Sequence, residues 1–157
     1  MTAADDPLAL ERQVCFALSV AARGVIAAYR PILAPLGLTH PQYLVMLALW
    51  QDSPQSVRSL GRLLKQDSAT LSPLLRRLEK QELITRTRDS RDERVVLIGL
   101  TPTGKDLRRL AQAVPGQVMK RFGLTEQDLE TIHATMTQLV DAAAAALDDD
   151  LDLQQTH

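Results

Sequence analysis

The segment from residue 68 to residue 104 limits the fold of this chain most, because its sequence pattern changes twice. Residues 68–80 repeat leucine at helical spacing, whereas residues 83–88 are rich in β-branched side chains. A charged turn follows at residues 89–94, and residues 95–100 form a short apolar run. The pattern therefore predicts a helix, a strand, a charged hairpin tip and a second strand.

Two shorter helices are expected before this segment. Thr39 and Gln42 have the spacing of a capping box, with Thr39 as N-cap, and they open a helix that runs to Trp50. A second helix spans residues 57–64 and should turn four side chains inward: Val57, Leu60, Leu63 and Leu64. A short helix, a longer helix and a hairpin are the layout of a winged helix-turn-helix. The expected fold is mostly α with a small β-wing, over about residues 40–101.

The charge of the chain is unevenly distributed along its length. The formal net charge is only −1, but residues 58–109 hold 13 Lys and Arg against 7 Asp and Glu. The two flanks together hold 5 basic and 12 acidic residues. A basic middle between acidic ends is expected of a protein that meets DNA with one face.

The helix at residues 68–80 has a polar face opposite its leucines. Small hydroxyls permit close approach to base edges and Arg suits guanine or phosphate, so five side chains are candidate DNA contacts: Ser68, Thr70, Ser72, Arg76 and Arg77. The simpler interpretation is an ordinary solvated helix face. Pro73 adds a conflict, because Ser72 and Pro73 would also suit a helix start. We expect the earlier start, at Asp67 or Ser68, with Pro73 one turn in.

The hairpin tip is cationic, and its candidate DNA contacts are Arg86, Arg88, Arg91, Asp92 and Arg94. Arg94 is the best candidate for a narrow minor groove, where negative potential is concentrated. Asp92, two residues earlier, is expected to pair with Arg94 and fix its direction. The alternative is a charged turn that only increases solubility.

Apolar side chains at helical spacing also occupy about residues 8–36 and 102–147. Pro31, Pro35 and Gly37 are expected to interrupt the first of these helices, and Pro115 with Gly116 to break or kink the later one. Two interpretations of the apolar stripes stay open. They pack within the chain, or they form a dimerisation region, which the twofold symmetry of DNA half-sites favours.

The chain is expected to be one soluble domain over residues 1–157, with a disordered tail at residues 148–157. Its first residues are acidic and lack the basic start of a signal peptide, and no apolar run approaches the roughly 18 residues of a membrane span. We therefore expect a cytoplasmic protein. The three histidines have no ligand spacing, so no metal site and no cofactor are expected: His40, His133 and His157.

Residues 68–104 resemble the MarR family of winged-helix repressors, with the tip Asp92-Glu-Arg94 and the exit Leu100-Thr-Pro-Thr-Gly104. The similarity runs over nearly the whole chain. It implies a homodimer that binds double-stranded DNA at a pseudo-palindromic operator. It also implies that Ser68, Thr70 and Arg77 lie near the major groove and Arg94 in the minor groove.

The lone cysteine, Cys15, falls on the apolar stripe of the first helix. It is either an inert core residue or a sensor whose thiolate is activated by donors from elsewhere. A helix start near Leu8 would put Cys15 two turns in, where the helix dipole helps little. Tyr29 lies fourteen residues later on the same face, about 21 Å away at roughly 1.5 Å per residue. The two side chains can therefore meet only across a dimer whose first helices run antiparallel and cross near Ala22.

Three stretches resemble the organic-hydroperoxide-sensing OhrR branch of the MarR family: Cys15-Phe-Ala-Leu18, Ala28-Tyr-Arg-Pro31 and Thr39-His-Pro-Gln-Tyr-Leu-Val-Met-Leu47. The resemblance implies a one-cysteine sensor in which a peroxidatic Cys15 is hydrogen-bonded to the partner subunit's Tyr29. His40 stands where the branch usually has a second tyrosine, and Ser19 where some members have another. His40 either replaces that donor or serves only as a helix-start residue.

The resemblance implies a DNA-binding repressor that releases its operator once an organic hydroperoxide oxidises Cys15 to a sulfenic acid. With no second cysteine, the product would react with a low-molecular-weight thiol, a backbone nitrogen or more peroxide. Three alternatives stay open: a repressor released by a small aromatic ligand, with Cys15 structural; a thiol peroxidase; and an interaction module that binds no DNA. No catalytic base or oxyanion site is visible, so an enzyme is not expected.

Overall fold

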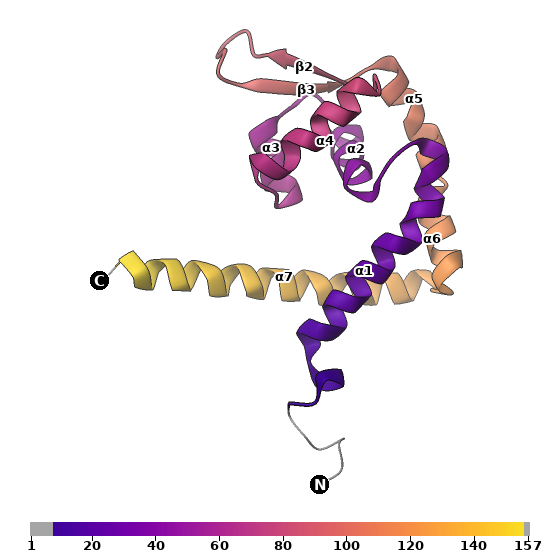
Figure 1. Ribbon diagram of the computed structural model, residues 1–157, viewed down its shortest axis with the longest axis vertical. Coiled ribbons are helices and arrows are strands. Elements are labelled where there is room, and N and C mark those ends of the chain that lie inside the picture. Colours follow the sequence, from indigo (N-terminus) through magenta and orange to yellow (C-terminus); the bar gives the residue numbers. More distant parts are fainter. Residues whose placement is uncertain (1–7, 156–157) are drawn as a thin grey trace. The chain divides into compact units, whose positions relative to one another are not determined.

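The computed structural model describes residues 8–155, with the side chains of residues 8–10 and 12–147 (Figure 1). The chain divides into two compact units, residues 1–118 and 119–157, which are described separately. As the sequence predicted, the fold is mostly helical with one small sheet. In chain order the elements are η2 (Leu10–Arg12), α1 (Val14–Leu33), η3 (Ala34–Leu36), α2 (His40–Gln51), β1 (Gln55–Ser56), α3 (Val57–Leu64), α4 (Ser68–Lys80), β2 (Ile84–Arg88), β3 (Val96–Leu100), α5 (Pro102–Ala111), α6 (Val114–Phe122) and α7 (Glu126–Gln155).

The three strands form an antiparallel sheet in the order β1–β3–β2. β2 pairs with β3 from Ile84 opposite Leu100 to Arg88 opposite Val96, and the short β1 covers the other edge of β3. The β2–β3 hairpin projects from the helices as a wing (Figure 1). The predicted helix, strand, charged tip and strand are therefore present in the predicted order.

One hydrophobic core joins the helix-turn-helix to the wing. Leu71, Leu75 and Leu78 of α4 are at most 1% exposed, and they share one face because the helix repeats every 3.6 residues. The expected burial of Leu63 is wrong, since its side chain is 54% exposed. The eight residues of α3 make only two turns, which bury a single stripe around Leu60. The other fully buried residues are Leu33, Val45, Met46, Leu49, Ile84, Ile98 and Val114.

Four helices end in the same kind of left-handed cap. A residue one or two positions after each helix has a positive φ, at Gly37 (68°), Lys65 (52°), Glu82 (59°) and Gly123 (63°). The next N–H then donates to the carbonyl five residues earlier, as Leu83 does to Leu78 at 3.1 Å. Lys65 and Glu82 thus hold a conformation that costs a residue with a Cβ about 1 kcal/mol. The Lys65 cap ends α3 at the turn into α4.

The ends of α1 differ from the sequence-based expectation. The helix begins at Val14 after the short turn η2, rather than near Leu8, and it continues through Pro31 to Leu33. Pro31 removes one backbone hydrogen bond, the one its own N–H would make, and the helix ends two residues later.

The break after α5 also differs, because it falls after Ala111 and not at Pro115. Pro115 and Gly116 lie in the first turn of α6. The N–H groups of a first helical turn have no partner within the helix, so a proline removes nothing there.

α7 begins with reciprocal capping bonds and ends later than predicted. The Thr125 N–H donates to the Asp128 carboxylate at 2.8 Å, and the Asp128 N–H donates to Thr125 Oγ1 at 3.2 Å. The helix then runs on to Gln155, so residues 148–155 are helical rather than a disordered tail. Extending an existing helix needs no new nucleation, and this favours the longer form. Residues 156 and 157 lie outside the described residues.

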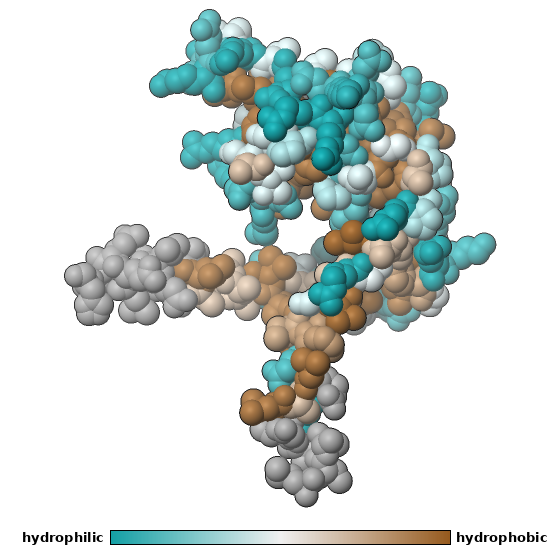
Figure 2. All heavy atoms as spheres, viewed as in Figure 1, coloured by the Kyte–Doolittle hydropathy of each residue, from teal (hydrophilic) through white to brown (hydrophobic). Residues whose placement is uncertain are grey.

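α1 exposes much of its apolar face. Val14, Val20 and Ile26 are 67%, 45% and 44% exposed, and hydrophobic surface follows this helix in Figure 2. The segment Val14–Leu36 is long and apolar enough to cross a membrane, by length and composition alone, which differs from the sequence-based expectation. A helix that packs on another chain passes the same test, and this one carries Arg23 near its middle.

α7 has an exposed apolar stripe of its own. Ile132, Met136, Leu139, Val140 and Leu147 are each at least 36% exposed. Within its own unit, each of the two helices therefore leaves apolar side chains exposed, and the dimerisation interpretation stays open.

Candidate nucleic-acid interface and cysteine site

α4 begins at Ser68, as predicted, because Asp67 caps it. Asp67 Oδ1 accepts the Thr70 backbone N–H at 2.7 Å, and this bond holds the pKa of the Asp67 carboxyl below its ordinary value. Pro73 accordingly lies inside the helix, so the alternative start at Ser72 is wrong. The cap leaves Ser68 and Thr70 at an exposed helix start.

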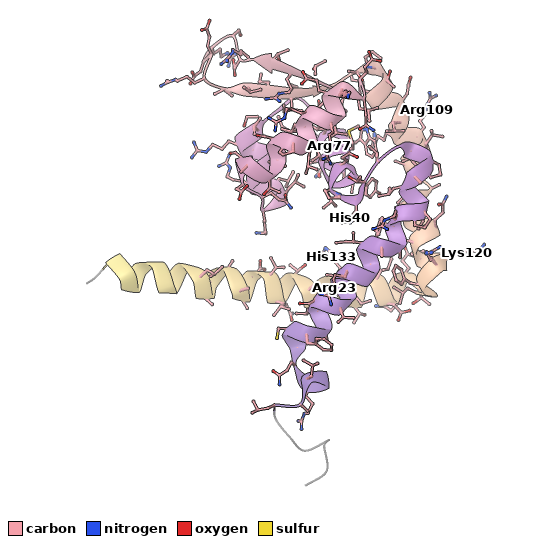
Figure 3. The ribbon with its side chains drawn as sticks, viewed as in Figure 1. Arg23, His40, Arg77, Arg109, Lys120 and His133 are labelled. Carbon is pink, nitrogen blue, oxygen red and sulfur yellow. The ribbon has the colours of Figure 1, made fainter. Side chains whose placement is uncertain are left out.

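The polar face of α4 is open to solvent. Arg76 and Arg77 are exposed, and within the described residues neither guanidinium has an ion pair or a side-chain hydrogen bond (Figure 3). Ser72 is half-buried, and its hydroxyl donates to the Ser68 carbonyl at 2.7 Å. That hydroxyl can still accept a bond but has no proton left to donate. Among the described residues, two cations without an ion pair therefore remain on the face that was expected to read DNA, beside the hydroxyls of Ser68 and Thr70.

The wing tip is held in shape by its own side chains. Asp92 Oδ1 accepts both the backbone N–H and the Nε–H of Arg94, each at 3.1 Å. The predicted pairing of Asp92 with Arg94 is present, and the Arg94 side chain is still 92% exposed. Arg88 Nη1 donates to the Glu93 carbonyl oxygen at 2.6 Å. The guanidinium of Arg88 therefore braces the turn, while that of Arg94 points outward from it.

The two remaining wing arginines occupy different settings. Arg86 is half-buried on β2, opposite Ile98. Arg91 is exposed, and its backbone N–H donates to Asp89 Oδ1 at 2.8 Å. In the part of the chain that the structure describes, the tip arginines whose guanidinium faces solvent without a bond to the backbone of the wing are thus Arg91 and Arg94.

Three further cations border the start of α4 and were not singled out from the sequence. Arg58, Arg62 and Lys65 are exposed and line an open hollow of about 410 Å³ that also reaches Ser68. Their spacing of four and then three residues places them on one face of α3 and its cap. That spacing is visible in the sequence of residues 58–65 and is the signal that indicates them.

Cys15 lies in the first turn of α1 and is exposed. Two expectations for Cys15 are therefore wrong. It is not buried in the core of its own chain, and it does not lie two turns into the helix. Near a helix start the peptide dipoles favour an anion, which suits a thiolate. Ser19 stands where some members of the OhrR branch have a tyrosine. Its hydroxyl donates to the Cys15 backbone carbonyl at 2.8 Å, so its proton is already used in a bond to the backbone.

Tyr29 and His40 lie together near the other end of α1. Their ring centroids are 5.0 Å apart in an edge-on arrangement, and the Tyr43 ring lies 6.1 Å from that of Tyr29. Partial burial raises the pKa of the Tyr29 hydroxyl and lowers that of the His40 imidazole. At neutral pH the phenol keeps its proton and the imidazole is uncharged, so Tyr29 is a neutral donor beside a neutral ring.

Cys15 and the Tyr29–His40 pair do not meet within one chain. Fourteen residues of α1 separate Cys15 from Tyr29, about 21 Å at roughly 1.5 Å per residue. Among the described residues no group of three or more His, Cys, Asp or Glu side chains is arranged to hold a metal ion.

A hairpin wing beside an open, cationic helix of a helix-turn-helix defines a winged-helix DNA-binding protein. Comparison with known proteins agrees with that class. Residues 27–109, more than half of the chain, match the family model described as transcriptional regulator SarA/Rot. The chain is 39% identical over 136 residues to the organic hydroperoxide resistance transcriptional regulator of Bacillus subtilis, covering 87% of this chain and 92% of that protein.

Solved structures extend the comparison to DNA complexes. Reduced AbfR bound to DNA, a protein of Staphylococcus epidermidis, is 31% identical with a TM-score of 0.70, covering 86% of this chain and 94% of that chain. The overoxidised form of AbfR, also bound to DNA, is 30% identical with the same TM-score, covering 85% and 94%. The chain belongs to the MarR family of winged-helix transcriptional regulators, in the branch of the organic hydroperoxide regulators. It is a DNA-binding regulator of transcription.

Proposed function

We propose that this protein is a cytoplasmic repressor that binds a pseudo-palindromic operator as a homodimer and releases it when an organic hydroperoxide oxidises Cys15. The observation that carries the proposal is the position of Cys15, exposed in the first turn of α1 and one helix length from Tyr29 and His40. An antiparallel pair of α1 helices would bring each thiol to the partner subunit's Tyr29. The exposed apolar face of α1 supplies surface for such a pairing.

The DNA-binding part of the proposal assigns three roles. α4 enters the major groove, with Ser68 and Thr70 at base edges and Arg77 at guanine or phosphate. Arg94 enters the adjacent minor groove. Arg76, Ser72 and the other wing residues complete the contact surface: Arg86, Arg88, Arg91 and Asp92.

The oxidation is a two-electron transfer from sulfur to peroxide. The Cys15 thiolate attacks the terminal oxygen of the hydroperoxide, so an S–O bond forms while the O–O bond breaks. The leaving alkoxide takes a proton from solvent and departs as an alcohol, and Cys15 becomes a sulfenic acid. A low-molecular-weight thiol can then form a mixed disulfide with release of water. A protonated Tyr29 supports the first step, because it can donate a hydrogen bond to the thiolate.

Release of DNA follows from geometry. Oxidation replaces the thiolate that the Tyr29 hydroxyl would bond with a larger group, the sulfenic acid or the mixed disulfide, and the α1 helices then shift. Two reader helices must match major grooves about 34 Å apart, so a small change in their separation weakens binding by both at once.

The test is operator binding by reduced protein during titration with cumene hydroperoxide, with Cys15→Ser as the matched variant. Wild type should release DNA at about one peroxide per chain, and Cys15→Ser should bind with unchanged affinity and ignore peroxide. Release of DNA by the oxidised variant would refute Cys15 as the sensor. Consumption of many peroxides per chain would instead indicate a thiol peroxidase.

One observation favours a second candidate, a repressor released by a small aromatic ligand. Tyr43, Trp50, Arg108 and Gln112 line a hollow of about 270 Å³ between α2, α5 and α6. Its aromatic walls and single cation would suit an aromatic carboxylate. Tight operator binding that ignores peroxide in both wild type and Cys15→Ser would favour this candidate.

A further inference from the structure

Gln42, in the first turn of α2, is one of two polar side chains that are buried among the described residues, at 4% exposed. The other, Gln55, bonds only within its own stretch of chain: its Nε2 donates to the carbonyls of Ala48 and Asp52, and its Oε1 accepts the Ser59 hydroxyl at 3.2 Å. Gln42 reaches much farther along the chain. A buried amide with a distant partner ties two elements together, because leaving it unpaired is unfavourable.

The bonds of Gln42 link the start of α2 to the end of α4. Gln42 Oε1 accepts the Thr39 backbone N–H at 2.9 Å and the Thr39 hydroxyl at 3.1 Å. Gln42 Nε2 donates to Gln81 Oε1 at 3.1 Å, and Gln81 Nε2 donates to the Gly37 carbonyl at 2.8 Å. The two glutamines therefore fasten the loop at residues 37–39 to the cap of α4.

Gln81 is the C-cap residue of α4, and Glu82 after it holds the left-handed turn into β2. The thirteen residues of α4 span about 20 Å at 1.5 Å per residue. A tilt of about 5° about the C-terminal end would move the Ser68 end by roughly 2 Å. A small change in the bond between Gln42 and Gln81, at the C-terminal end of α4, would therefore produce a larger displacement at the N-terminal end, which the proposal places against DNA.

The same turn of α2 carries a residue of the cysteine site. His40 lies between Thr39 and Gln42 in sequence, and its ring is 5.0 Å from that of Tyr29. Any rearrangement of Tyr29 against His40 acts on the turn that holds Gln42. No other side-chain hydrogen bond among the described residues joins α2 to the cap of α4.

We propose that Gln42 and Gln81 are positioning residues that couple the Tyr29–His40 pair to the orientation of α4. This inference rests on the proposed function, since it concerns how oxidation of Cys15 reaches the DNA-reading helix. The glutamines touch neither the oxidant nor DNA, and they transmit the change through the bond between them.

The experiment compares wild type with Gln81→Met, which keeps the length of the side chain and removes both of its hydrogen bonds. Two quantities are measured: the rate of Cys15 sulfenic acid formation with cumene hydroperoxide, and the ratio of operator Kd values, oxidised over reduced. Gln81→Met should be oxidised at the wild-type rate, while its Kd ratio falls at least tenfold. A purely structural role would weaken binding in both states and leave the ratio unchanged.

Two variants make the result decisive. Gln117→Met is the matched control, because Gln117 is exposed and makes no side-chain hydrogen bond among the described residues, so it should retain the wild-type ratio. If Gln81→Met does not fold, Gln81→Glu replaces it. The carboxylate of that variant can still accept the hydrogen bond from Gln42 but cannot donate to Gly37, so its Kd ratio should fall less. A wild-type ratio in the folded Gln81 variant overturns the coupling alone. A wild type that keeps its operator after oxidation of Cys15 overturns the proposed function instead.

Discussion

Arg88 and Arg94 lie on the same hairpin and carry the same charge, but their guanidinium groups have different partners and different exposure. Arg88 donates to the Glu93 carbonyl oxygen inside the turn, whereas the Arg94 guanidinium is 92% exposed and aimed by Asp92. An arginine that is exposed and oriented can enter a groove without first giving up a bond to the backbone. The two residues should therefore respond differently to the same substitution.

Arg94→Ala should weaken operator binding roughly tenfold and lower the slope of log K against log salt by about one. Arg109→Ala is the matched control, because Arg109 lies on α5 and pairs with Asp106 at 3.2 Å (Figure 3). Fluorescence anisotropy at several salt concentrations measures both quantities. An unchanged salt slope for Arg94→Ala would show that this guanidinium stays outside the grooves.

At the scale of elements, the wing depends on a close approach of backbone at Gly104. A Cβ at Gly104 would overlap the Leu83 carbonyl oxygen, which accepts the Thr101 N–H at 3.2 Å. The Trp50 indole N–H also donates to the Gly104 carbonyl at 2.8 Å. The start of α5 is thus held against α2 and against Leu83, the residue that precedes β2.

Gly104→Ala should lower the free energy of unfolding by about 2 kcal/mol, since an added methyl group must displace backbone. Gly116→Ala is the opposite control. Gly116 lies in α6 with open space where its Cβ would be, so alanine should raise stability by about 0.5–1 kcal/mol. Urea denaturation followed by circular dichroism gives both values. Equal effects of the two substitutions would contradict the steric argument.

The elements that the sequence predicted correctly are those set by short-range chemistry. The Thr39 capping box, the Asp67 start of α4 and the Asp92–Arg94 pair each join residues two or three apart, so spacing alone reveals them. Pro31 and Pro115 misled because the effect of a proline depends on its distance from a helix end. The bond from Gln42 to Gln81 spans 39 residues, and only the folded chain brings these two side chains together.

For the whole molecule, the proposed dimer would build each sensor from two chains. A dimer of one Cys15→Ser chain and one Tyr29→Phe chain should contain one complete site and one empty site. Its remaining Cys15 should react with peroxide at the wild-type rate, while a Tyr29→Phe homodimer reacts roughly tenfold more slowly for want of a hydrogen-bond donor.

Differently tagged chains allow the mixed dimer to be purified, and trapping of the sulfenic acid with dimedone gives the rates. Identical rates in the mixed dimer and the Tyr29→Phe homodimer would mean that Tyr29 does not act across the dimer. That result would leave the assignment to the winged-helix regulators unchanged, because the assignment does not rest on the role of Tyr29.

The wing tip bears on the thermodynamics of association. The turn at residues 89–94 already makes its own hydrogen bonds before any DNA is present. A loop that arrives in its bound form loses little conformational entropy on docking. The heat capacity change on operator binding should then be small for the wing. Most of the free energy that the wing contributes to operator binding would then come from the release of counterions, which raises the entropy of the solution.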